Sequence, residues 1–172
     1  MPERAPVRDA TAADGAVLAR IYNHYIAHTI VTFEEAPVGA EDMAGRVAAT
    51  GAAGFPWLVA QTPTGVAGYA YACRWRERHA YRHSVEVTVY LDVAAVGQGL
   101  GTQLYTALFD RLRGGGCHVA IGVIALPNDA SVALHEKFGL RKVAHFAEVG
   151  CKFGRWIDVG YWQLILREPA PA

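Results

Sequence analysis

The sequence has no excess of charge of either sign, since sixteen Lys and Arg residues balance sixteen Asp and Glu residues in a chain of 172. Dedicated nucleic-acid-binding domains usually carry a basic excess, so this class of protein is disfavoured. No apolar run approaches the roughly 20 residues that a membrane-spanning helix needs, and the first residues lack the apolar segment of a secretory signal. We therefore expect a soluble, cytoplasmic protein that binds neither nucleic acid nor a membrane.

Cysteine is also scarce. Cys73, Cys117 and Cys151 are odd in number and far apart, which argues against a disulfide framework and against a structural zinc site. His24 and His28 could place two imidazoles on one side of a helix. The residue after His24 is tyrosine, however, so the H-E-x-x-H zinc signature is absent. We expect no bound metal.

Hydrophobic residues make up 52% of the chain, and the length predicts one domain over residues 1–166, followed by a short C-terminal tail over residues 167–172. Apolar alternation and turn signals predict strands near Val7 and over residues 30–33, 57–61, 66–74, 84–91, 119–124, 141–148 and 159–166. Helical spacing and a capping-box pattern predict helices from about residue 11 to 26 and over residues 40–50, 100–112 and 129–138. This mixture predicts a three-layer α/β domain with a central mixed sheet flanked by helices.

A glycine-rich loop between a strand and a helix is the most informative segment. It contains Gly97, Gly99 and Gly101 and opens directly into the helix predicted over residues 100–112. Backbone N–H groups can converge there at the positive end of the helix dipole and bind an anion. A Rossmann fingerprint would need glycine at Thr102, and a P-loop would need a lysine that this loop lacks. Two readings stay open: a pyrophosphate cradle made of backbone N–H groups, and a plain glycine-rich turn.

These residues resemble the acetyl-CoA motif of the GNAT N-acetyltransferases, which ends in G-x-G after a strand. A second element of that family, an Asn followed by a short helix that ends in Gly, is matched by residues 128–139. Residues 32–37, 84–91, 134–136 and 161–164 are similar to the phosphinothricin and methionine sulfoximine acetyltransferase branch. The resemblance covers residues 7–166.

The resemblance implies a GNAT fold with a mostly antiparallel sheet, acetyl-CoA as co-substrate, a small amino-acid-like amine as acceptor, and a homodimer. One departure is Val96, which stands where the motif usually has Gln or Arg, so a side-chain contact to the cofactor is lost. The residues implied to bind the cofactor are Val89, Tyr90, Leu91, Gly97, Gln98, Gly99, Leu100, Gly101, Thr102 and Asn128.

Acetyl transfer to an amine needs a base, because the amine is mostly protonated at neutral pH. Glu86 is a carboxylate on an apolar strand close to the glycine-rich loop, and the resemblance implies that it is the general base in a direct transfer. It would act directly or through one ordered water. Alternation alone allows a simpler interpretation, an outward-facing carboxylate on the polar side of the strand. A backbone N–H of residues 89–91 is the expected donor to the developing oxyanion.

His135 stands where many members of this family have a tyrosine, four residues before Gly139. A histidine there could act as the general acid that protonates the departing thiolate. The alternative is a helix histidine that packs on the pantetheine arm of the cofactor or is solvated. Asn128 is implied to bind that arm, and its alternative role is to cap the following helix.

The run of residues 74–82 is basic and contains aromatic residues. Arginine binds carboxylates and phosphinates with two hydrogen bonds, although most basic runs are merely solvated surface. The resemblance implies that Arg76, Arg78 and Tyr81 hold the acid end of the acceptor. It also implies that Phe33 is an apolar wall of the same pocket and Val123 a backbone contact; core packing is the alternative for both.

The leading interpretation is therefore an acetyl-CoA-dependent N-acetyltransferase for the α-amino group of a small amino acid such as phosphinothricin or methionine sulfoximine. A protein N-terminus or an aminoglycoside is a second class of acceptor. A third interpretation is an acyl-CoA-binding sensor without catalytic activity, which predicts a missing or displaced base.

Overall fold

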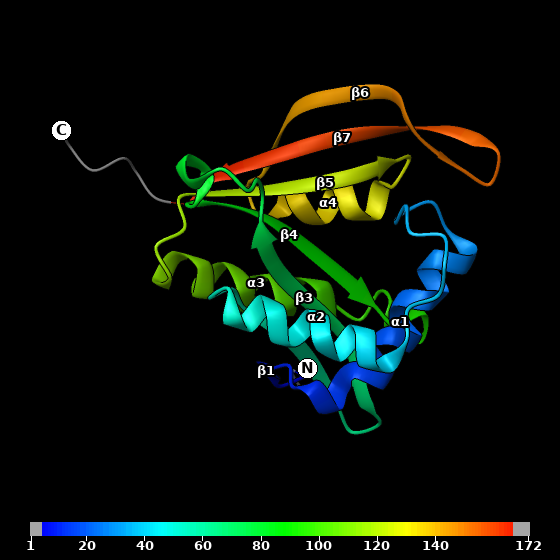
Figure 1. Cartoon of the computed structure of the whole chain (residues 1–172), viewed down its shortest axis with the longest axis vertical. Helices are drawn as coiled ribbons and strands as arrows, with labels where there is room; N and C mark the ends of the chain where they lie inside the picture. The colour runs from blue at the N-terminus through cyan, green and yellow to red at the C-terminus, as the bar shows by residue number, and fades with distance from the viewer. Residues whose placement is uncertain (1–4, 167–172) are drawn as a thin grey trace.

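The computed structural model describes residues 5–166, which form one seven-stranded sheet with helices on both faces (Figure 1). The strand order is β1-β2-β3-β4-β5-β7-β6; β4 and β5 are parallel and every other neighbouring pair is antiparallel. The predicted mixed, mostly antiparallel sheet is thus confirmed, whereas the predicted tail lies outside the described residues. The strands are β1 (Val7–Asp9), β2 (Trp57–Thr62), β3 (Gly65–Arg74), β4 (Ser84–Leu91), β5 (Val119–Leu126), β6 (Arg141–Lys152) and β7 (Arg155–Ile165).

Two pairs of helices cover the two faces because side chains alternate along each strand. Val85 and Val87 of β4 pack into a core under α3 (Leu100–Gly114) and α4 (Asp129–Lys137). Tyr69 and Trp57 face the opposite way, into a core with α1 (Gly15–His28) and α2 (Ala40–Ala52). The four predicted helices are confirmed, with ends shifted by a few residues. None of these helices, in the described part of the chain, has the length and apolarity needed to cross a membrane.

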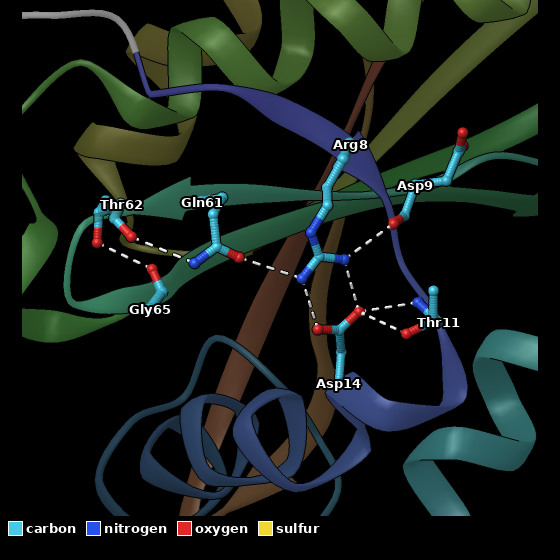
Figure 2. Close-up of polar contacts among 7 residues, drawn as sticks. All are labelled: Arg8, Asp9, Thr11, Asp14, Gln61, Thr62 and Gly65. Carbon is cyan, nitrogen blue, oxygen red and sulfur yellow. Dashed lines mark hydrogen bonds and ion pairs between the residues drawn. The ribbon is translucent and has the colours of Figure 1, made fainter.

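Asp14 fixes the beginning of the helical layer. The Thr11 N–H donates to its carboxylate at 2.8 Å, as the predicted capping box requires, and Arg8 donates two hydrogen bonds of 2.8 Å to the same group (Figure 2). Arg8 also donates to the Asp9 carbonyl and the Gln61 side chain, so the guanidinium joins β1, β2 and the helix start. These contacts, with the Arg8 hydrogen bond as the largest cause, lower the pKa of Asp14 to about 2.

The strand predicted over residues 30–33 is wrong, since this segment connects α1 to α2 without joining the sheet. Side chains satisfy its backbone instead of a neighbouring strand. The Thr29 hydroxyl accepts from the Val31 N–H and the Thr32 hydroxyl from the Glu34 N–H, both at 3.3 Å. The Lys152 ammonium donates to the Thr32 carbonyl at 2.7 Å. Such local bonds compete with sheet pairing, which explains why an apolar, β-branched segment does not become a strand.

β4 and β5 pair over only three residues each, residues 84–86 with residues 119–121. Beyond this point β4 stays paired with β3, and β5 with β7. The sheet therefore opens as a V between residues 87–91 and residues 122–126, and the two strands are seen to diverge in Figure 1. Backbone polar groups on the inner edges of the V lack a strand partner, so they are available to a ligand.

The β6–β7 hairpin is longer than the sequence predicts, because residues 149–152 and 155–158 also belong to its strands. Two register shifts interrupt the side-chain alternation on which the prediction depends. Phe153 and Gly154 form the turn and both have positive φ. The hydrogen bond from Lys152 brings this end of the hairpin next to the segment that connects α1 to α2 (Figure 1).

Candidate active site

A cavity of about 320 Å³ lies in the V between β4 and β5 and has walls from both faces of the sheet. It brings together six residues that the sequence predicts for the site and that come from three separate segments: Val89, Tyr90, Leu91, Val123, Asn128 and His135. Its remaining lining residues are Tyr25, Val31, Val87, Thr88, Val96, Tyr105, Ile124, Ala125, Ala130, Ser131 and Leu134.

Tyr25 is a lining residue that the sequence did not reveal. Its hydroxyl donates to the Leu91 carbonyl at 2.6 Å and so ties α1 to the open end of β4. The sequence shows Tyr25 only as an apolar position of a helix, because nothing in the spacing indicates which side of the V that helix covers.

The glycine-rich loop leads from β4 into α3 as predicted. Gly97 and Gly99 have φ of +83° and +79°, a conformation that glycine adopts without steric cost. Because α3 begins at Leu100, the N–H groups of its first turn have no acceptor within the helix. Gly101 lies against Leu134 of α4, where an added Cβ would be 3.2 Å from a methyl group. Unpaired N–H groups at the positive end of a helix can bind phosphate oxygens.

Side chains around this loop add one charge that the sequence analysis missed. The Lys137 ammonium at the end of α4 donates to the Thr102 hydroxyl in the first turn of α3, at 3.2 Å. The ammonium therefore lies beside the predicted anion site, although it is 35 positions away in the chain. Gln98 is used within the loop, where its side chain donates to the Ala94 carbonyl at 3.0 Å. Val96 is 58% exposed.

Glu86 lies at the last position of β4 that pairs with β5, where the V begins to open. It shares a row with Cys73 of β3 and Ile121 of β5, on the face that α1 and α2 cover. No hydrogen bond to the carboxylate comes from the described residues. Burial raises the pKa of Glu86, and the positive charge of Arg76 opposes that rise. A desolvated carboxylate without hydrogen bonds is a better proton acceptor than an exposed one.

Cys73 is the thiol next to this carboxylate. Burial, and to a smaller extent the charge of Glu86, raise the pKa of Cys73 to about 11. A thiol with such a pKa is protonated at neutral pH and is a poor nucleophile.

His135 lies on the other face of the sheet and is only 3% exposed. Its Nδ1 is 2.7 Å from the Ser131 carbonyl, which can only accept, and its Nε2 is 3.0 Å from the Tyr105 hydroxyl. The network assigns the proton to Nδ1 and makes Nε2 the acceptor of the Tyr105 hydrogen bond. The ring also packs on the backbone of Gly122, where a Cβ would overlap it. Burial lowers the pKa of His135.

Asn128 caps α4 with its side-chain oxygen, which accepts from the Ser131 N–H at 3.2 Å. The residue also lines the cavity in the V. The capping role and the cavity position are compatible, because the cap uses the amide oxygen and leaves the amide NH₂ group for another partner.

The residues of the basic run after β3 lie at different distances from Glu86. The Arg76 guanidinium lies 4.9 Å from the centre of the Trp75 ring, and Trp75 meets Tyr81 edge to face. Arg76 is also close enough to Glu86 to influence its pKa. Arg78 precedes the short 3₁₀ helix of residues 79–81, and its side chain is exposed. Aromatic packing thus gathers part of this run near Glu86.

Phe33 comes from the segment between α1 and α2, away from the basic run in sequence. Its side chain is 42% exposed, and one face of the ring packs on Gly150 of β6. Within residues 5–166, neither the Arg76 nor the Arg78 guanidinium makes a cation–π contact with the Phe33 ring.

Comparison with known proteins gives consistent matches. A family model described as the acetyltransferase (GNAT) family matches residues 18–140. The chain is 42% identical to a phosphinothricin N-acetyltransferase of Streptomyces viridochromogenes, over 99% of this chain and 93% of that protein. It is 37% identical to an L-methionine sulfoximine/L-methionine sulfone acetyltransferase of Salmonella typhimurium, over 95% and 96%. The structure superposes on an acetyltransferase of Salmonella typhimurium, solved with its cofactor acetyl-CoA, with a TM-score of 0.94 and 36% identity over 98% of each chain.

Proposed function

Because this chain belongs to the GNAT family of acetyltransferases, we propose that it transfers an acetyl group from acetyl-CoA directly to the α-amino group of a small amino acid of the phosphinothricin or methionine sulfoximine type. The observation that carries the proposal is the position of Glu86, a desolvated carboxylate at the point where β4 and β5 separate. A sensor without activity would need no base at that point.

Acetyl-CoA would occupy the V and supply the acetyl group as a thioester. The first turn of α3 and residues 97–102 would hold the pyrophosphate through backbone N–H groups, with the Lys137 ammonium nearby. Residues 89–91 and Asn128 line the cavity at the position expected for the pantetheine arm. The fit is supported by the unpaired inner edges of β4 and β5, since an arm that carries amides needs donors and acceptors there.

In the proposed reaction Glu86 accepts a proton from the acceptor ammonium, directly or through a water. The free amine then attacks the thioester carbonyl carbon, the C–S bond breaks, and CoA leaves as a thiolate. The second proton of the attacking nitrogen passes to that thiolate or to solvent, which leaves the neutral amide and Glu86 with the first proton. A backbone N–H of residues 89–91 would stabilise the oxyanion. Direct transfer is favoured over an acetyl-cysteine intermediate, because the adjacent Cys73 has its pKa raised to about 11.

The structure supports a different part for His135 from the one expected. Both ring nitrogens have partners, and burial lowers the pKa of the imidazole, so a proton donor at neutral pH is disfavoured. We assign to His135 a structural role, in which its hydrogen bonds hold Tyr105 and Ser131 in the lining of the cavity. The CoA thiolate is a competent leaving group without it.

For the acceptor, Arg76, Arg78 and Tyr81 are proposed to bind its acidic groups, and Phe33 to contact its side chain. An amine without a carboxylate would leave Arg78 without an anionic partner, and we expect a low kcat/KM for such an amine. We measure release of free CoA with L-phosphinothricin, L-methionine sulfoximine, their decarboxylated analogues, an aminoglycoside and a peptide. Arg78→Ala should lower kcat/KM for the amino acids far more than for the analogues, whereas Arg113→Ala on α3 should change neither. Faster acetylation of the peptide or the aminoglycoside would overturn the acceptor assignment.

A homodimer is proposed as well, formed through the β6–β7 hairpin. This hairpin carries an unusual number of exposed large apolar side chains: Val143, Phe146, Val149, Phe153 and Trp156. Light scattering of the purified protein measures its oligomeric state, and Trp156→Arg should yield a monomer. A cytoplasmic location stays a prediction from the sequence.

A further inference from the structure

Lys152, the last residue of β6, is a buried cation that makes no ion pair with a carboxylate among the described residues. The charge of Glu35 opposes the lowering of its pKa by burial, and its ammonium lies 5.1 Å from the centre of the Phe153 ring. Only 1% of the residue is exposed. The hydrogen bond from its ammonium to the Thr32 carbonyl, 2.7 Å long, joins two segments that are 120 positions apart. Burying an ammonium group costs free energy unless it is well paired, so its position between these segments calls for an explanation beyond stability.

Thr32 is the point where three elements meet. Its hydroxyl lies 2.7 Å from the Tyr22 hydroxyl of α1 and is near enough to the Tyr90 side chain of β4 to oppose the rise of the Tyr90 pKa that burial causes. The Tyr22 hydroxyl donates onward to Glu34 at 3.0 Å, and Glu34 pairs with Arg46 of α2 at 2.7 Å. The segment thus has side-chain anchors to α1 and α2. Lys152 supplies the anchor to β6 and is the one that holds the backbone of Thr32.

The two neighbours of Thr32 both bear on the proposed site. Val31 lines the cavity in the V, whereas Phe33 is outside that lining and is the wall proposed for the acceptor side chain. The Phe33 ring rests on Gly150, two residues before Lys152 on the same strand, where any Cβ would overlap it. Gly150 therefore seats the ring, and Lys152 fixes the backbone that carries it.

We propose that Lys152 is a positioning residue for acceptor recognition: through the Thr32 carbonyl it fixes the segment that presents Val31 and Phe33 to the acceptor. This inference rests on the proposed function, since it takes the acceptor to lie against Phe33. It predicts that loss of the ammonium impairs acceptor binding and leaves cofactor binding intact, because no hydrogen bond or ion pair among the described residues joins Lys152 or Thr32 to the glycine-rich loop.

The central test is Lys152→Met, which keeps the length of the side chain and removes the donor and the charge. We expect the KM for L-methionine sulfoximine to rise, with a loss of about 10-fold to 10²-fold in kcat/KM, the scale that follows when positioning is disturbed by about an ångström. The affinity for CoA, measured by calorimetry, should not change. The Tm should stay level or rise, since an apolar residue often replaces a buried charge without loss of stability.

Two further variants separate positioning from general packing. Lys152→Arg keeps a cationic donor and should recover part of the lost kcat/KM. Gly150→Ala leaves Lys152 in place but puts a methyl group where the Phe33 ring packs, and should also raise the KM for L-methionine sulfoximine. If Lys152→Met does not fold, this variant tests whether the position of Phe33 controls acceptor binding. Lys142→Met, at an exposed lysine of the same strand, is the matched control and should behave as the wild type.

The outcomes also distinguish this inference from the proposed function. If the wild type acetylates neither amino acid, the proposed acceptor is wrong, and the variants are assayed with the amine that the wild type does acetylate. If the wild type is active and Lys152→Met keeps its KM, or loses kcat, CoA affinity and Tm together, the positioning role is overturned.

Discussion

Glu86 and His135 lie on opposite faces of the seam between β4 and β5, and their surroundings differ in a way that decides what each can do. Glu86 is desolvated but receives no hydrogen bond from the described residues, so its pKa rises and its proton affinity is available to a ligand. His135 is buried more deeply, yet both ring nitrogens already have partners. A titratable side chain can transfer a proton only when its lone pair or proton is not already committed to the fold.

The difference follows from the side-chain alternation of β4. Val85 and Val87 point into the core under α3 and α4, the side on which His135 packs against Gly122, whereas Glu86 shares its face of the sheet with Tyr71 and Tyr90. One strand thus separates the side where His135 is held by hydrogen-bond partners from the side where the Glu86 carboxylate has none among the described residues. A shift of β4 by one residue would turn Glu86 to the opposite face of the sheet, and the site would lose its base.

The largest effect is expected from Glu86→Gln, which removes the base with almost no change in shape. We expect kcat to fall by about 10²-fold to 10⁴-fold, the usual range for a lost general base, with CoA affinity unchanged. Raising the pH should restore part of the rate, because more of the amine is then already deprotonated. Steady-state kinetics from pH 6 to 9 checks this. Full activity of the variant at pH 7 would contradict the assignment.

A smaller effect is expected at His135, where the comparison predicts lost stability rather than lost chemistry. His135→Phe leaves the Tyr105 hydroxyl buried without its partner, which should cost about 1–3 kcal/mol of the free energy of unfolding. The fall in kcat should be far smaller than for Glu86→Gln. The double variant Tyr105→Phe/His135→Phe removes both polar partners and should regain part of the stability. A loss of kcat as large as that of Glu86→Gln, in a folded variant, would restore the general-acid role.

Arg76 offers a test by pH alone. Its charge opposes the raised pKa of Glu86, so Arg76→Gln should raise that pKa further. Activity needs the carboxylate form, and it therefore declines as the pH falls through the Glu86 pKa. The acid limb of the kcat profile, normalised to its own maximum, should then move to higher pH. Arg82→Gln, at a neighbouring exposed arginine, is the control, and an unmoved limb in Arg76→Gln would contradict the proposed electrostatic coupling.

Hydrophobic periodicity predicts the strands and helices whose backbone hydrogen bonds follow a regular pattern. The alternation of residues 84–91 and the helical spacing of residues 100–112 were enough, because each pattern matches the backbone ladder that forms. The segment over residues 30–33 failed for the opposite reason. Its composition is that of a strand, but threonine hydroxyls and the distant Lys152 ammonium take its backbone groups, and no local pattern encodes a donor so far along the chain.

The candidate site can be predicted from the sequence to the extent that it lies in contiguous segments. The sequence singles out the glycine-rich loop and Glu86 because strand, loop and helix follow one another directly, and the role of each stays a prediction. Tyr25 and Lys137 were missed, since each reaches the site from a helix whose orientation depends on tertiary packing. His135 was recognised by position, but its burial depends on Gly122, which lets the ring pack on β5. Spacing identifies a residue type at a place, whereas its protonation depends on neighbours that only the fold supplies.

The smallest effect is expected for Asp14. Its carboxylate accepts several hydrogen bonds, whereas that of Glu86 accepts none from the described residues. Arg8 and the Thr11 N–H hold its pKa at about 2, below the ordinary value of 3.8. The ion pair therefore contributes stability above the unfolded-state pKa, and that contribution is lost as the pH falls from about 4 to about 2. Asp14→Asn should cost about 1 kcal/mol at pH 7, because Arg8 is 41% exposed and solvent screens the pair. Urea unfolding at pH 7 and pH 2 should show a difference from the wild type only at the higher pH. Asp9→Asn, in an ion pair with Arg111 where both side chains are more than half exposed, should show no difference at either pH; an equal loss in the two variants would mean that burial of the carboxylate is not what gives Asp14 its effect.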